Sequence, residues 1–161
     1  MLKRSMHAEF KIVRKMGKSK IHEDYCRKLK ELGDLLGYDT DIPRSGLYHL
    51  ANPDAVWYID TKIEGFHKIP LMVFEVLYSE GEKAIRGSVS SVLIYGSPIG
   101  VLVMIREGYK HRKKRLTEEE NIAHFKGYIR KLIDSFGLER RIFLWTEDQV
   151  DSLLTRHQKL L

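Results

Sequence analysis

Residues 70–78 read Pro-Leu-Met-Val-Phe-Glu-Val-Leu-Tyr, a nearly unbroken apolar run with one carboxylate, Glu75, in its middle. A short apolar run of this kind is typical of a strand that is buried on both faces. Because side chains alternate along a strand, Val73, Glu75 and Leu77 share one face. A buried carboxylate is costly unless it is paired or binds a cation. The strand therefore predicts that Glu75 has a basic partner or holds a metal ion.

Helices and strands alternate around this strand in the order α-β-β-β-α-β-α-β-α. Hydrophobic periodicity and end signals give helices over 19–37, 79–96, 117–137 and from 146, and strands over 38–42, 55–59, 70–78, 99–105 and 141–145. Between them, 61–68 is expected to form a polar turn and 107–116 a basic loop. This order predicts an α/β domain with a mixed sheet, antiparallel at first and parallel later, with helices on its faces.

Three of the helix starts carry the pattern of a capping box, in which Ser or Thr is followed three positions later by Glu or Gln. The pairs are Ser79 with Glu82, Thr117 with Glu120, and Thr146 with Gln149. The helix over 117–137 also has one strongly apolar face, which we expect to be buried. Its members are Ile122, Phe125, Ile129, Leu132, Ile133 and Phe136.

Length and charge narrow the class of protein. At 161 residues the chain is expected to form one domain over 19–161, preceded by a basic arm or short helix over 1–18. The 28 Lys and Arg outnumber the 22 Asp and Glu, giving a net charge of +6. This excess indicates a polyanionic partner, and nucleic acid is the leading candidate. The alternative is a basic surface that is only solvated. The high charged fraction, 31%, and the few Asn and Gln residues lean toward a thermophilic source.

Cysteine content and hydropathy bear on location. The single cysteine, Cys26, has no internal disulfide partner, so we expect a reducing, cytoplasmic setting. One cysteine also excludes a zinc module built on several cysteines. The longest apolar run, over 99–105, is far shorter than the roughly 18 residues that span a bilayer, so no membrane partner is expected.

A second carboxylate precedes Glu75 in the chain. Pro53-Asp54 lies where a loop enters the strand over 55–59, twenty-one positions before Glu75. If the two strands pair, the carboxylates converge and form a site for Mg²⁺, which prefers oxygen ligands. The alternatives are that Asp54 is only a turn residue and that Glu75 only pairs with a basic side chain.

Five segments together resemble the PD-(D/E)xK nuclease superfamily, which includes type II restriction endonucleases and Holliday-junction resolvases. They are 22–37, 53–57 (Pro-Asp-Ala-Val-Trp), 74–76 (Phe-Glu-Val), 83–93 and 142–146. The resemblance implies a restriction-endonuclease-like, three-layer α/β/α fold with a mixed central sheet of about five strands. It also implies that Asp54, Glu75 and the carbonyl of Val76 hold Mg²⁺ or Mn²⁺ for hydrolysis of DNA. Many relatives are dimers, which leaves a homodimer open.

The chain departs from the family pattern at one position. Relatives usually carry a lysine two residues after the glutamate, where this chain has Leu77. Lys83, in the next helix, is the candidate replacement, although a solvated lysine explains it equally well. Relatives also place an acidic residue of the first helix in the site. For that role Glu23 is a candidate by its position in the helix, and His22 by both its position and its orientation. Without a replacement lysine the chain is expected to bind nucleic acid without cutting it, or to use the fold only as a protein-interaction scaffold.

The loop over 107–116 contains a run of six side chains that can carry positive charge. They are Lys110, His111, Arg112, Lys113, Lys114 and Arg115. On DNA such a run makes phosphate contacts that do not depend on sequence, and otherwise it is a flexible charged loop. No phosphate-binding glycine loop is found, and the sequence alone places no Ser-His-Asp or Cys-His set.

Overall fold

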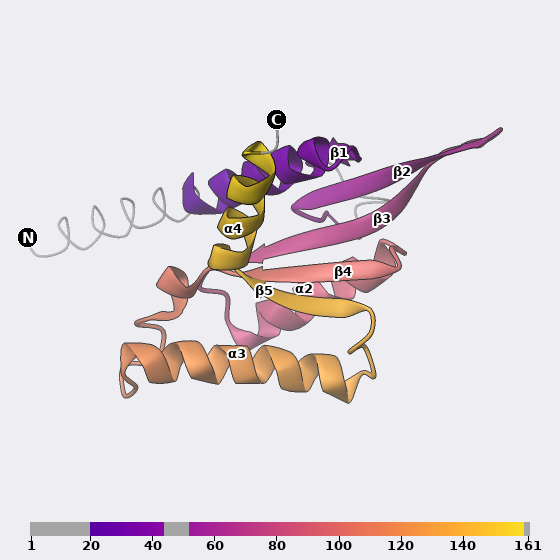
Figure 1. Ribbon diagram of the computed structural model, residues 1–161. Helices are drawn as coiled ribbons and strands as arrows, with labels where there is room; N and C mark the ends of the chain where they lie inside the picture. Colours follow the sequence, from indigo (N-terminus) through magenta and orange to yellow (C-terminus); the bar gives the residue numbers. More distant parts are fainter. Residues whose placement is uncertain (1–19, 44–51, 160–161) are drawn as a thin grey trace, which may run out of the picture.

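A five-stranded mixed sheet lies between two layers of helices in the computed structural model, which describes residues 20–43 and 52–159 (Figure 1). The strands lie side by side in chain order and are β1 (Asp39–Asp41), β2 (Ala55–Ile63), β3 (Phe66–Leu77), β4 (Ile99–Met104) and β5 (Ile142–Thr146). The pairs β1–β2 and β2–β3 are antiparallel, and β3–β4 and β4–β5 are parallel. The predicted α/β class and the change from antiparallel to parallel pairing are confirmed.

The helices cover both faces of this sheet. They are a helix over residues 20–35, α2 (Glu82–Ile94), α3 (Glu118–Ser135) and α4 (Glu147–Gln158), and a short 3₁₀ helix, η1 (Arg106–Tyr109), follows β4. In Figure 1, α2 and α3 lie below the sheet, while α4 and the indigo helix over 20–35 lie above it. None of the helices in the described ranges is long and apolar enough to cross a membrane. The predicted arm over 1–18 and the expected first residue of the helix over 19–37 fall outside the described residues.

Each face of the sheet has its own core, because successive side chains of a strand point to opposite sides. On one face Val73 and Leu77 of β3 pack against α2 and α3. On the other face Phe74 and Val76 pack against the helix over 20–35 and α4. Glu75 therefore belongs by alternation to the α2 face, between two core residues.

The helix over 20–35 is fixed tightly to β2. The indole nitrogen of Trp57 donates to the backbone carbonyl of Leu29 over 2.9 Å. Gly33 makes this close approach available, since a Cβ there would lie 2.6 Å from the Trp57 indole nitrogen and 2.4 Å from Thr40 Cγ2. A glycine inside a helix weakens it, and here the loss is offset by packing of the helix on the sheet. The first described turn of the helix is thereby held at a defined place above β2.

The predicted polar turn over 61–68 is present but much shorter, since it is confined to residues 64–65 and includes Gly65 with a φ of +80°. β2 continues to Ile63 and β3 begins at Phe66, so the two strands form a long hairpin whose end extends away from the body in Figure 1. Its end was missed because it extends beyond the cores and shows no apolar alternation. Pro70 is tolerated within β3 because it lies beside a bulge in the β2 pairing, and β4 pairs with β3 only from Met72 onward.

Two predicted helix details are corrected, and two are confirmed. Ser79 does not cap α2: it has a φ of +60°, and Gly81 is the N-cap, without a side-chain hydrogen bond. Phe136 is not on the buried face of α3, since it lies just past the last turn and is 61% exposed. The capping boxes that begin at Thr117 and Thr146 are both present.

Candidate functional site

The carboxyl ends of β3, β4 and β5 lie at one edge of the sheet, because these strands are parallel. Asp54 reaches the same edge because it directly precedes β2, which runs the opposite way. The register pairs Ala55 with Phe74, so the next position places Asp54 opposite Glu75. Residues that oppose each other across antiparallel strands are close neighbours. The fold thus brings the two predicted carboxylates to adjacent positions.

Asp54 is held in place by three hydrogen-bonding contacts. Its backbone N–H donates to the carbonyl of Phe74 over 3.0 Å. Its carboxylate oxygen Oδ2 accepts the backbone N–H of Val76 over 2.7 Å and lies 3.1 Å from Nε2 of His22. Val76 therefore contacts Asp54 through its amide nitrogen. The family resemblance instead assigns the carbonyl of Val76 to the metal. Asp54 is a fixed, hydrogen-bonded carboxylate rather than a simple turn residue.

His22 bridges Asp54 to the chain's single cysteine. While Nε2 faces Asp54, Nδ1 lies 3.6 Å from Sγ of Cys26, one helical turn further along the same helix. The hydrogen bond with Asp54, and to a smaller extent that with Cys26, raises the pKa of His22 to about 10 despite partial burial of the ring. Burial raises the pKa of the Cys26 thiol. At neutral pH the cluster is therefore an imidazolium between a carboxylate and a neutral thiol.

Glu75 belongs by strand alternation to the face of the sheet that α2 covers. Burial, and next the negative charge of Asp54, raise the pKa of Glu75 to about 8, while hydrogen bonds with Ser91 and Ser88 of α2 act in the opposite direction. The two carboxylates therefore act on each other through a medium of low dielectric constant. Their hydrogen-bond partners come from different layers, because Asp54 is bound by His22 and Glu75 by the two serines.

The position of the family lysine is part of the core. Leu77 is 1% exposed and packs with α2 and α3, so this position offers the carboxylates no charged or polar group. Lys83 is exposed in the first turn of α2, and the structure records no contact between it and either carboxylate in the described ranges. Glu23 is exposed on the helix over 20–35, beside His22. Among the candidates outside the two strands, His22 is the one for which the described part of the structure records a contact with Asp54.

A hollow of about 530 Å³ opens beside this cluster. Asp54, His22 and Cys26 line it together with Glu23. The other lining residues come from the helix over 20–35 and from both ends of the segment that joins β1 to β2; they are Lys20, Arg27, Ile42, Pro43, Asn52 and Pro53. The ion pair of Asp54 and His22 is thus accessible to a ligand from this side.

Comparison with protein-family models, with curated proteins and with solved structures gives no match for this chain.

The predicted basic loop is shaped by one buried residue, Asn121 of α3. This side chain is 0% exposed and makes four hydrogen bonds with the loop backbone. Its Nδ2 donates to the carbonyls of Lys113, Leu116 and Thr117, and its Oδ1 accepts the N–H of Lys113. The loop backbone is therefore anchored to α3 through this side chain.

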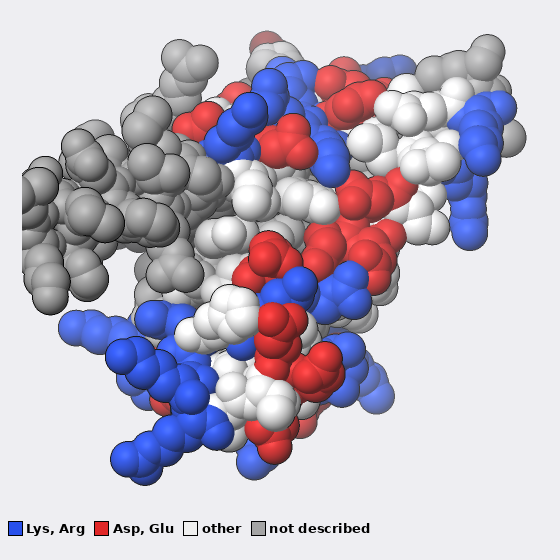
Figure 2. Space-filling view, turned by 90° about the vertical axis from the view of Figure 1, so that its left-hand side faces the viewer, with Lys and Arg blue, Asp and Glu red and all other residues white. Residues whose placement is uncertain are grey.

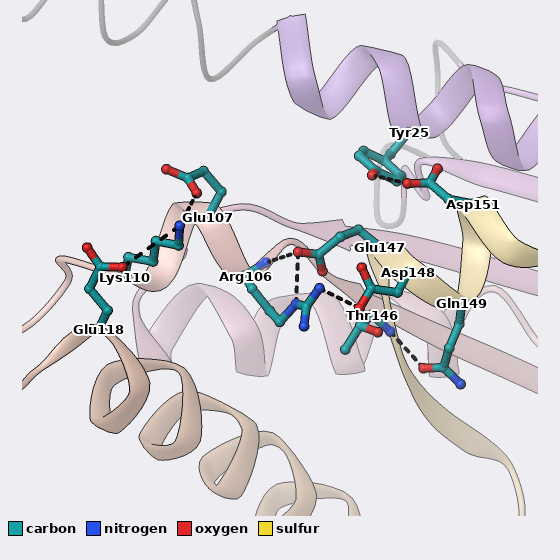
Figure 3. Close-up of polar contacts among 10 residues, drawn as sticks. All are labelled: Tyr25, Arg106, Glu107, Lys110, Glu118, Thr146, Glu147, Asp148, Gln149 and Asp151. Carbon is teal, nitrogen blue, oxygen red and sulfur yellow. Dashed lines mark hydrogen bonds and ion pairs between the residues drawn. The ribbon is translucent and has the colours of Figure 1, made fainter.

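Acidic neighbours neutralise part of the loop. Lys110 pairs with Glu107 and Glu118, as Figure 3 shows, and Lys113 lies 3.8 Å from Glu82. At the same edge Arg106 is held by two acids at the start of α4 (Figure 3).

The rest of the loop's charge faces solvent, on exposed side chains of Arg112, Lys114 and Arg115. Figure 2 looks onto the side where the arrowhead of β3 ends. There Lys and Arg gather at the lower left, at the height of α3, while Asp and Glu lie across the middle.

Sequence reasoning missed three residues of the site. Cys26 was interpreted only as a free thiol, although its spacing of four from His22 places both on one side of a helix. Ser88 and Ser91 have the spacing of three that also puts them on one helix face, but nothing in the sequence says that this face meets Glu75.

Proposed function

We propose that the chain is a Mg²⁺-dependent nuclease that hydrolyses DNA phosphodiester bonds at the edge where Asp54 and Glu75 meet. The observation that carries the proposal is the β2–β3 register, which places Asp54 opposite Glu75. Carboxylates that repel each other at a sheet edge favour a divalent cation between them. The layered mixed sheet supports the finer assignment to a restriction-endonuclease-like fold.

The donor set fits magnesium. Asp54 and Glu75 offer hard carboxylate oxygens, and these two residues would hold the ion. Bound there, Mg²⁺ polarises a phosphate and lowers the pKa of an attacking water. The chain's own contribution is to fix Asp54 through the Val76 amide and to keep Glu75 in a poorly hydrated position. His22 supplies the one cation that the described part of the structure places on Asp54.

A second candidate function is binding of nucleic acid without cleavage. It is favoured by the burial of Leu77 at the lysine position and by the exposed, unconnected place of Lys83. Without a basic side chain beside the attacking water, cleavage loses the group that orients it. The loop with Arg112, Lys114 and Arg115 remains able to contact phosphates.

The experiment is a cleavage assay with the full chain. Labelled linear duplex, single-stranded and four-way-junction DNA, and matching RNA, are incubated with Mg²⁺, Mn²⁺ or EDTA. We expect metal-dependent DNA cleavage that Asp54→Ala and Glu75→Gln each lower by more than the roughly 10–100-fold loss caused by removing an outer-shell partner. Asp134→Ala, which removes an exposed carboxylate from the end of α3, is the matched control and is expected to cleave normally.

Two results would overturn the assignment. Cleavage that persists unchanged in Asp54→Ala would place the activity elsewhere. Absence of cleavage on every substrate, together with salt-sensitive binding of DNA, would replace the nuclease by the non-cleaving binder.

A further inference from the structure

The ligand atoms of His22, Cys26 and Asp54 form a cluster of a different chemical kind from the pair of carboxylates. One thiol sulfur, one imidazole nitrogen and one carboxylate oxygen all lie within 4.8 Å of one another. His22 and Cys26 come from one turn of the helix over 20–35, and Asp54 comes from the entry to β2. Magnesium takes oxygen ligands, whereas sulfur and imidazole select softer divalent ions.

Each of the two contacts of His22, taken singly, is close to the separation of two ligand atoms on a tetrahedral zinc ion. Zn–N bonds of about 2.0–2.1 Å and Zn–S bonds of about 2.3 Å at a tetrahedral angle separate the two ligand atoms by about 3.6 Å. Nδ1 of His22 and Sγ of Cys26 are 3.6 Å apart. The corresponding nitrogen–oxygen separation is about 3.4 Å, and Nε2 of His22 lies 3.1 Å from Oδ2 of Asp54. These contacts use opposite ring nitrogens, so an ion would bind one nitrogen only and the imidazole would have to turn toward it.

The surroundings supply the other features of a metal site. The Val76 amide holds the Asp54 carboxylate over 2.7 Å, which is the kind of outer contact that orients a ligand. All three residues line the hollow of about 530 Å³, so an ion can enter and a further ligand can reach it. Cys26 is otherwise 5% exposed, so its sulfur is screened from the bulk solvent.

We propose that His22, Cys26 and Asp54 form a binding site for Zn²⁺, with three protein ligands and a fourth position open to the hollow. Binding of the ion releases the proton of the His22 imidazolium and the proton of the Cys26 thiol to solvent. The site stands independently of the nuclease proposal. Because it uses Asp54, a zinc ion there competes with magnesium for the same carboxylate. Zinc is then an inhibitor of any Mg²⁺-dependent reaction at this edge of the sheet.

The test is titration of the full, metal-free chain with Co²⁺, the spectroscopic substitute for Zn²⁺. A thiolate–cobalt bond gives a charge-transfer absorption in the near ultraviolet, and the chain has one cysteine, so this band reports Cys26 alone. We expect the band to saturate at one ion per chain and to disappear when Zn²⁺ is added. Histidines outside the described residues cannot produce it.

Variants assign the other two ligands. Cys26→Ser is expected to abolish the band, and His22→Gln and Asp54→Asn are each expected to weaken Co²⁺ binding by at least about tenfold. His111→Gln removes an exposed imidazole that pairs with Glu118, and it is the matched control that keeps normal binding. Circular dichroism establishes that each variant is folded. Absence of the band in the unmodified chain, or unchanged affinity in both His22→Gln and Asp54→Asn, overturns the site.

The outcome separates this inference from the proposed function. A chain that shows the cobalt band but cleaves no nucleic acid keeps the zinc site and loses the nuclease. A chain that cleaves DNA with Mg²⁺ but lacks the band keeps the nuclease and loses the zinc site. If both hold, Zn²⁺ is expected to inhibit cleavage by the unmodified chain and to inhibit Cys26→Ser at least about tenfold less strongly.

Discussion

The backbone N–H of Val76 donates to the carboxylate of Asp54 over 2.7 Å, which ties the entry of β2 to β3 one residue beyond Glu75. The position of one carboxylate is therefore set by the main chain of the strand that carries the other. Glu75 is held separately by Ser88 and Ser91 of α2. Two layers of the fold must be in place before the carboxylates face each other, so stability and site chemistry are linked at this edge.

Glu75 should make the metal-free protein less stable as the pH rises. Its pKa is about 8 in the folded chain and near 4.5 when unfolded, so between these values the folded state holds a proton that the unfolded state has lost. The free energy of unfolding then falls with rising pH across this window, by on the order of 3–5 kcal/mol from Glu75 alone. Urea denaturation in EDTA at pH 5, 7 and 9 measures the change.

Glu75→Gln removes this titration and is the companion variant. We expect it to unfold at higher urea than the unmodified chain at pH 9 and to show a smaller change between pH 5 and pH 9. Glu139→Gln, at an exposed carboxylate, is the control and should follow the unmodified chain. Marked destabilisation of Glu75→Gln at pH 9 would show instead that the ionised carboxylate is part of a stabilising contact.

Phe125 and Phe136 should differ sharply in their contribution to stability. Phe125 is 2% exposed in the core under α3, so Phe125→Ala should lower the free energy of unfolding by about 3–5 kcal/mol. Phe136 is 61% exposed, so the same truncation there should change it by about 0.5 kcal/mol or less. Chemical denaturation of both variants makes the comparison, and a loss below about 1 kcal/mol for Phe125→Ala would contradict the packing of α3.

Truncation of the buried Asn121 should lower the free energy of unfolding much more than truncation of an exposed amide side chain. Asn121→Ala removes four hydrogen bonds with the loop backbone and leaves buried groups unpaired, so we expect a loss of about 2–4 kcal/mol in unfolding free energy. Gln158→Ala, which removes one exposed hydrogen bond with Glu31, should have little effect. Equal stability of the two variants in guanidinium titrations would mean that the loop does not depend on Asn121.

The exposed cations of the loop should set the salt dependence of DNA binding. If Lys114 and Arg115 each neutralise one phosphate, the double alanine variant should lower the slope of log affinity against log salt by about 1.8. A double variant at Lys30 and Lys68, which lie on other elements and pair with Asp34 and Asp39, loses the same charge and should keep the slope. Fluorescence anisotropy at several salt concentrations gives both slopes, and equal slopes would remove the loop from the interface.

The sequence was informative about the fold wherever burial imposes a period. The apolar run of β3, the buried stripe of α3 and the two Thr-headed capping boxes were predicted for that reason and are present. The long hairpin end was missed because strands outside the cores have no apolar alternation to reveal them. Ser79 was misassigned because the box pattern ignores backbone geometry, and its φ of +60° places it in the turn before α2.

The candidate site was less predictable, since it depends on how layers meet. The spacing of Asp54 and Glu75 and the β-pattern sufficed to predict neighbouring strands. The contact of His22 with Asp54 agrees with the orientation inferred from the helical wheel. The serine partners of Glu75 and the thiol beside His22 depend on how α2 and the helix over 20–35 pack on the sheet. Hydrophobic periodicity predicts which face of a helix is buried, but not the orientation of the helix on the sheet.

Strand order equal to chain order has a consequence for how the molecule assembles. Each strand pairs with the one made just before it, so the sheet can grow in the direction of synthesis. The bond between Tyr25 and Asp151 spans 126 positions and joins the helix over 20–35 to α4 (Figure 3). Folding on the ribosome is therefore complete only when α4 emerges and covers the first helix, and a chain cut before α4 leaves that core open to water.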